Sequence, residues 1–132
     1  QVLDEFPEDV AALNDLGYLW ADGNVRLQRA HRMLRQAVKG DPDNGAYRDS
    51  LGWVLYRLGR FEEAVAELEK AAAGDGEEEA DPVILDHLGD AYDAAHQAEK
   101  AKDAWSRALE ALEKGEDTKM AEAVQRKLSN IP

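Results

Sequence analysis

A Leu-Gly pair with similar flanking sequence occurs three times along this chain of 132 residues, at positions 16/17, 51/52 and 88/89. The pairs are 35 and 37 residues apart, and the sequence around each pair is similar. A repeat of this length is one supersecondary unit that cannot bury its apolar face alone, so its copies must stack on one another. The chain is therefore expected to form a short array of three units rather than two globular domains.

Three further columns of residues follow the glycines at nearly constant distances. They are Ala30, Ala64 and Ala101, then Leu34, Leu68 and Trp105, then Ala37, Ala71 and Ala108. Small residues at fixed places allow two antiparallel helices to approach closely, and a bulkier side chain would push them apart. Each unit is therefore expected to be a helical hairpin.

The pattern resembles the tetratricopeptide repeat, whose unit of about 34 residues carries a large residue, Leu-Gly, an aromatic residue, Ala and then Pro. The aromatic column here is Trp20, Leu55 and Tyr92. Pro7 and Pro42 stand ten residues before their glycines, whereas Pro82 stands only seven before Gly89. The resemblance covers about residues 7–115 and implies an all-α fold, a right-handed α-solenoid of three helix-turn-helix hairpins.

The sequences 51–60 and 85–92 are also similar to those of bacterial tetratricopeptide arrays at the C-terminal end of larger proteins. This likeness suggests a bacterial source. Arrays of this family occur in the cytoplasm, in the periplasm and in lipid-anchored proteins, so the resemblance leaves the compartment open.

The helices are expected near residues 8–21, 25–39, 44–58, 61–73, 82–95 and 98–113. The repeats then span residues 8–41, 42–81 and 82–115, with an acidic loop at 74–81 and Asp81-Pro82 as the N-cap and first turn of a helix. Residues 116–132 carry the apolar stripe Ala121, Val124 and Leu128, which is typical of an amphipathic helix that caps a solenoid.

Residues 1–7 look like the remnant of a preceding repeat, and further repeats are expected before Gln1. An uncapped N-terminal end exposes apolar surface, which could promote self-association. Two alternative functions follow, namely a structural module that associates through its stacked ends and an accessory segment of an enzyme encoded upstream.

Composition excludes several classes of function. The 28 acidic residues outnumber the 16 basic residues, which gives a net charge of −12 and argues against nucleic-acid binding. There is no cysteine and no apolar run long enough to insert into a membrane. The three histidines are scattered over three hairpins, and the pair His87 and Asp90 offers only two metal ligands. The chain is expected to be non-enzymatic, without a cofactor or a metal.

In the family that this chain resembles, the first helix of each unit lines the inner face of the array. That inner face is therefore the surface most informative about function. Helical periodicity around each Leu-Gly pair selects the residues expected there. They are Asn14, Asp15, Tyr18 and Asp22, then Asp49, Trp53, Tyr56 and Arg57, then Asp86, His87, Asp90 and Asp93. Two interpretations compete: an acidic protein carries acids on every face, or these carboxylates and aromatics form a peptide-binding groove.

A groove with six aspartates and one arginine selects a basic peptide segment of a partner protein, whose identity the sequence leaves open. Some tetratricopeptide domains instead hold acidic chaperone tails with a Lys/Asn/Arg clamp. At the clamp positions this chain has Asn14, Tyr18, Ser50, Val83 and His87, and only the asparagine matches. Trp53 has a second interpretation, as a packing residue between the first two units.

Overall fold

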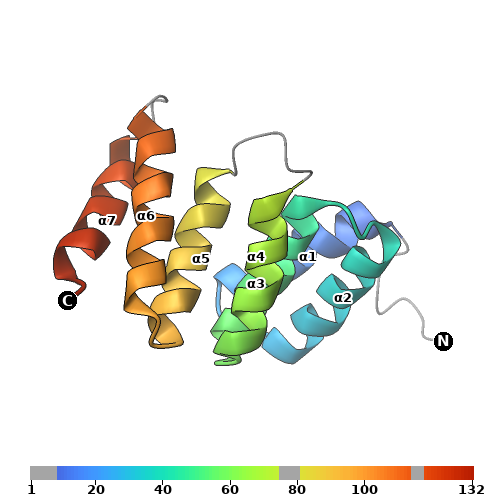
Figure 1. Cartoon of the computed structure of the whole chain (residues 1–132). Coiled ribbons are helices and arrows are strands. Elements are labelled where there is room, and N and C mark those ends of the chain that lie inside the picture. The colour runs from blue at the N-terminus through green and yellow to red at the C-terminus, as the bar shows by residue number, and fades with distance from the viewer. Residues whose placement is uncertain (1–8, 75–80, 114–117) are drawn as a thin grey trace.

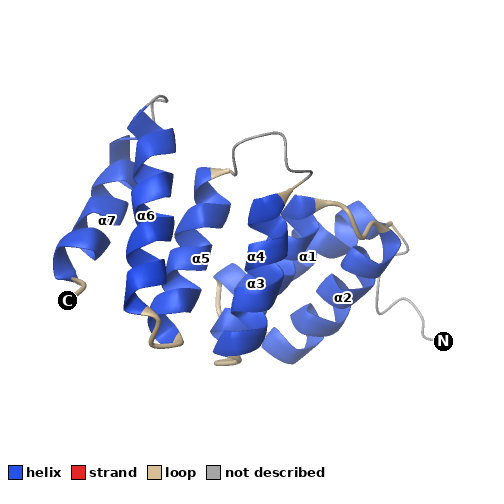
Figure 2. Ribbon diagram, viewed as in Figure 1, coloured by secondary structure: helices blue, strands red, loops and turns tan. Residues whose placement is uncertain are grey.

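A computed structural model describes residues 9–74, 81–113 and 118–132 of the chain, and these residues form helices and turns without any strand (Figures 1 and 2). The helices are α1 (Val10–Asp22), α2 (Leu27–Gly40), α3 (Gly45–Arg57), α4 (Phe61–Ala73), α5 (Pro82–Ala94), α6 (Ala98–Glu113) and α7 (Thr118–Asn130). The all-α fold predicted from the repeat is confirmed.

The helices pack as three successive hairpins, α1–α2, α3–α4 and α5–α6, and α7 covers α6 at the end of the row (Figure 1). Each first helix also contacts the first helix of the next hairpin, α1 with α3 and α3 with α5. The second helices α2, α4 and α6 make no comparably close contacts with one another in the described part of the chain. The first helices therefore form an inner layer, where the candidate site lies.

The glycines of the Leu-Gly pairs lie where the two helices of each hairpin come closest. A Cβ atom added at Gly17 would lie 2.7 Å from Leu34 Cγ, and one added at Gly52 would lie 2.5 Å from Leu68 Cγ. At Gly89 an added Cβ would overlap the indole of Trp105. Ala30, Ala64 and Ala101 are fully buried beside these contacts. The columns of small residues therefore mark the helix–helix contacts, as predicted from their spacing.

The three hairpin turns share one backbone conformation. Asn24, Gly59 and His96 each lie seven residues after a Leu-Gly glycine, and they have positive φ angles of 59°, 81° and 65°. The next amide donates to the carbonyl five residues earlier: Val25 to Trp20, Arg60 to Leu55 and Gln97 to Tyr92. This bonding pattern is the Schellman motif, in which glycine is the preferred residue.

Side-chain caps set where the first helices begin. Asp9, Asn44 and Asp81 accept hydrogen bonds from the amides of Ala11, Tyr47 and Val83 at 3.0, 3.1 and 2.7 Å. The predicted N-cap at Asp81 and the proline in the first turn of α5 are confirmed. The helix predicted at 25–39 instead begins at Leu27, because Arg26 has a left-handed conformation with φ of 50°.

The apolar stripe predicted for the C-terminal segment lies on α7. Val124 is fully buried, and Ala121 and Leu128 pack against the same core. The proposed remnant at 1–7 and most of the acidic loop at 74–81 lie outside the described residues. None of the helices that the structure describes has the length and hydropathy required to cross a membrane.

Candidate functional site

An unbroken stack of aromatic rings forms the floor of the inner face. The His87 ring of α5 stacks on Trp53 of α3 at a centroid distance of 4.0 Å, and Trp53 stacks on Tyr56 at 4.9 Å. Tyr18 of α1 lies 6.4 Å from the His87 ring on a tilted plane. Trp53 is only 7% exposed and His87 only 6% exposed. These rings therefore join all three hairpins and shape the groove from below.

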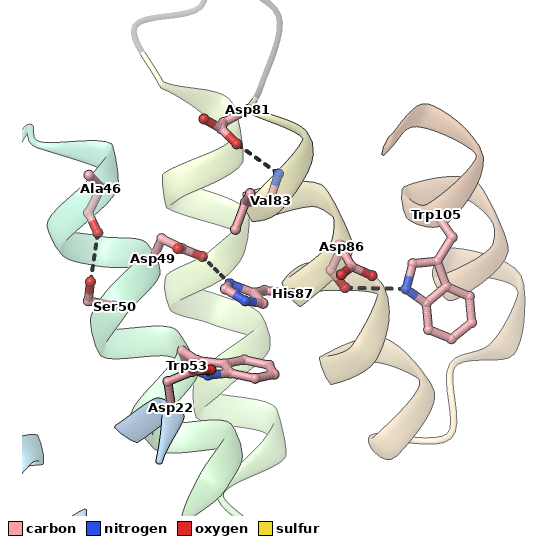
Figure 3. A network of polar contacts seen from close by, with 10 residues as sticks. All are labelled: Asp22, Ala46, Asp49, Ser50, Trp53, Asp81, Val83, Asp86, His87 and Trp105. Carbon is pink, nitrogen blue, oxygen red and sulfur yellow. Dashed lines mark hydrogen bonds and ion pairs between the residues drawn. The ribbon is translucent and has the colours of Figure 1, made fainter. Parts of the chain in front are cut away.

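The His87 ring is held in place by a buried carboxylate (Figure 3). His87 Nδ1 lies 2.9 Å from Asp49 Oδ1, and both side chains are buried. An imidazole with its hydrogen on Nδ1 can donate this hydrogen bond to the Asp49 carboxylate. The contact satisfies a buried polar group and fixes the ring plane against Trp53.

Asp22, at the end of α1, anchors the other side of Trp53. The indole Nε1 donates to Asp22 Oδ1 at 3.3 Å, and the Arg57 guanidinium donates to the Asp22 carbonyl oxygen at 3.1 Å. Arg57 also lies over the Trp53 ring, 4.9 Å from its centroid, and 3.8 Å from the Asp22 carboxylate. The arginine of the groove is therefore engaged with α1 and Trp53.

Lys127 of α7 reaches the inner face of α5 and was not among the residues predicted for the groove. Its Nζ donates to Asp86 Oδ1 at 2.8 Å and to Asp90 Oδ1 at 2.9 Å. Burial raises the pKa of Asp90, and Lys127 opposes that rise. Burial acts to lower the pKa of Lys127 itself, but the two carboxylates outweigh it and the pKa is raised. The C-terminal helix thus supplies one positive charge that compensates part of the negative charge of Asp86 and Asp90.

A pocket of about 350 Å³ opens at the other end of the inner face, between α1, α3 and the first turn of α5. Its lining is Asn14, Asp15, Tyr18, Leu19, Ala46, Asp49, Ser50 and Val83. Leu19 is 66% exposed and Val83 is 39% exposed, so the pocket presents two large apolar side chains to solvent. Burial, Asp22 and Asp49 raise the pKa of Tyr18, so its hydroxyl is protonated and can donate at neutral pH.

The structure gives the predicted groove residues different degrees of access. Asp15, Asp22 and Asp93 are exposed, whereas Asp49, Trp53 and His87 are buried. The remaining members, Asn14, Tyr18, Tyr56, Arg57, Asp86 and Asp90, have intermediate exposure. Assignment of these residues to peptide binding stays a prediction, and the buried ones can act only by shaping the groove.

Two features of the site were missed in the sequence. The i, i+4 spacing of Asp86 and Asp90 places both carboxylates on one helical face, and this spacing signals a shared partner such as Lys127. Leu19 was not selected, because its position two residues after Gly17 was assigned to neither the groove nor the core. The described residues contain no group of three or more side chains that could hold a metal ion.

Comparisons with known proteins agree with this architecture. Residues 23–81 match the family model for the tetratricopeptide repeat. A TPR repeat-containing protein of Pseudomonas aeruginosa is 36% identical over 84 residues, which is 64% of this chain. The match spans only 14% of that relative's length.

Several solved structures share the fold at low sequence identity. The type III secretion translocator chaperone SycD of Yersinia enterocolitica has a TM-score of 0.79 at 16% identity, covering 96% of this chain and 94% of that chain. PcrH, in complex with the chaperone-binding region of PopD, has a TM-score of 0.79 at 18% identity, covering 97% and 95%. The first repeat domain of RPAP3, bound to the HSP90 peptide SRMEEVD, has a TM-score of 0.70 at 18% identity, covering 97% and 100%.

Proposed function

We propose that this chain, which resembles tetratricopeptide-repeat proteins over residues 23–81, captures a basic segment of a partner protein on its inner face. The observation that carries the proposal is the convergence of carboxylates from α1, α3 and α5 on one face that also offers a pocket of about 350 Å³. A pocket of this size accepts side chains of a peptide rather than a folded surface.

The charges of the inner face support a cationic ligand. Its six aspartates are opposed by Arg57 and Lys127, while His87 can hydrogen-bond Asp49 without carrying a charge. Asp15 and Asp93 are exposed, and neither forms an ion pair with another described residue. The face therefore keeps a negative field, which raises the local concentration of cationic segments and speeds their association.

Proteins with similar folds bind peptides, which supports a peptide ligand here. One SycD structure is a complex with a peptide of the translocator YopD, and the RPAP3 domain holds the HSP90 peptide SRMEEVD. That HSP90 peptide has more acidic than basic residues, whereas the inner face of this chain is itself acidic. We therefore propose a ligand of the opposite charge.

The test is a random-peptide display selection at low salt with three proteins. They are the wild-type chain, an inner-face variant Asp15→Lys/Asp93→Lys, and an outer-face control Glu62→Lys/Glu110→Lys with the same change in net charge. All four positions are exposed, so these substitutions should leave the fold intact. The wild type and the outer-face control should enrich peptides rich in Lys and Arg, and the inner-face variant should lose them.

Two results would refute the proposal. The first is a selection in which the wild type enriches no basic peptides. The second is an equal loss of enrichment in both variants, because bulk charge rather than the inner face would then explain the binding. Selected peptides should also bind more weakly as salt is raised, since exposed charges are screened over about 8–10 Å at physiological ionic strength.

A further inference from the structure

We infer that the inner face recognises an apolar side chain together with a Lys or Arg within two positions of it, and that both are seated in the pocket between α1, α3 and the first turn of α5. The inference rests on the proposed function and specifies where the ligand sits and which residue types it must carry. Three observations support it. Large apolar side chains are exposed at the pocket, and its lining contains carboxylates but no Lys or Arg. Most carboxylates elsewhere on the inner face already have a cationic partner within the protein.

The exposed apolar side chains concentrate at this pocket. The large apolar residues that are exposed in the described chain are Leu19, Val25 and Val83, and two of these three line the pocket. Leu19 comes from the end of α1 and Val83 from the start of α5, so they flank the opening from different hairpins. An apolar ligand side chain placed between them would remove both from water, which is favourable in proportion to the area buried.

The pocket also carries carboxylates but no lysine or arginine in its lining. Its lining includes Asp15 at the exposed rim and Asp49 on the floor. Tyr18 and Ser50 add hydroxyl groups. A Lys or Arg next to the apolar residue of the ligand would supply the missing positive charge, and the exposed Asp15 is the carboxylate it can reach first.

Most carboxylates at the other end of the face already have a cationic partner within the protein. Lys127 Nζ bonds both Asp86 and Asp90. Arg57 lies against Asp22 and the Trp53 ring. A cation from a ligand would have to displace one of the protein's own cations at these places. The pocket is therefore a part of the inner face where a basic side chain can reach an exposed carboxylate next to exposed apolar side chains.

The inference can be tested by fluorescence anisotropy with three labelled peptides of equal length on a Gly/Ser background. One contains Leu and Lys two positions apart, one replaces the Lys with Gln, and one replaces the Leu with Ala. The peptide with both residues should bind the wild-type chain about tenfold or more tightly than either single-feature peptide, which corresponds to about 1.4 kcal/mol.

Matched variants locate the binding. Val83→Lys and Asp15→Lys should each weaken binding of the Leu/Lys peptide about tenfold or more. The controls are Val25→Lys, an exposed apolar residue outside the pocket lining, and Glu110→Lys, an exposed carboxylate of α6. Both controls should stay within about twofold of the wild type, because they lie outside the pocket. Leu19→Lys serves as a second pocket variant should Val83→Lys fail to fold.

The outcomes separate this inference from the proposed function. The inference is overturned if the Ala/Lys peptide binds as tightly as the Leu/Lys peptide. It is also overturned if the control variants weaken binding as much as the pocket variants, because the peptide would then not bind in the pocket. Binding of basic peptides to the inner face would still stand in that case. If no basic peptide binds at all, the proposed function fails and the inference fails with it.

Discussion

Replacing Gly89 with alanine tests the packing logic of the repeat at its tightest point. The new Cβ would overlap the indole of Trp105, whose Nε1 also donates to the Asp86 carbonyl oxygen at 3.2 Å. Overpacking in a well-filled core costs about 1–3 kcal/mol. Loss of the indole hydrogen bond costs about 0.5–1.5 kcal/mol. Alanine gains about 1 kcal/mol over glycine in a helix interior. The free energy of unfolding should therefore fall by about 0.5–3.5 kcal/mol.

Thermal and urea unfolding of Gly89→Ala measure this loss. For a chain of this size, each kcal/mol should lower Tm by about 3–5 °C. Gly45→Ala is the control, because a Cβ at that position meets nothing closer than the Ala71 carbonyl oxygen at 3.4 Å. In a double-mutant cycle with Trp105→Ala, the cost of the Gly89 substitution should disappear, since the clashing ring is gone. A Gly89→Ala protein as stable as the wild type, or a cycle without coupling, would refute the assignment of these glycines to the helix–helix contact.

Three other substitutions have expected outcomes. His96→Gly should raise the free energy of unfolding by about 1 kcal/mol, because φ is 65° at this position and glycine adopts a left-handed backbone without strain. Urea denaturation measures the change in stability, and a loss of stability would contradict the turn assignment. Asp49→Ala should destabilise by about 1–3 kcal/mol by leaving the buried His87 Nδ1 without its acceptor, and an unchanged midpoint would count against that contact. Lys127→Met should raise further the pKa of Asp90, which burial already raises, and a carboxyl with a higher pKa in the folded state gains stability as pH falls. The stability deficit of Lys127→Met should therefore be largest near neutral pH and narrow toward the ordinary pKa of aspartate; a deficit independent of pH would contradict this account.

The helical hairpins could be predicted from the sequence because their contacts repeat at a constant separation. Gly17 meets Leu34 and Gly52 meets Leu68 at separations of 17 and 16 residues, so packing constraints appear as columns in one sequence. The helix predicted at 25–39 started two residues early, since a left-handed Arg26 leaves no comparable signal.

The detail of the site depends on contacts between hairpins, which have no repeating sequence signal. The burial of Trp53 comes from His87, 34 residues further along the chain, and nothing in the composition of α3 indicates that α5 covers it. Lys127 meets Asp86 across 41 residues and belongs to a helix outside the repeat. Helical periodicity could select the residues of the face, but it could not determine which of them satisfy one another.

The contact between Tyr18 and His87 joins the first hairpin to the third across the middle one. In an ideal solenoid each unit touches only its neighbours, so the end units can melt while the rest stays folded. Here the middle hairpin also contributes Trp53, which stacks on His87 and donates a hydrogen bond to Asp22. Fraying of either end hairpin would strip partners from both other hairpins at once. We therefore expect the inner face to couple the hairpins into one cooperative folding unit, so that the surface proposed for binding also holds the array together.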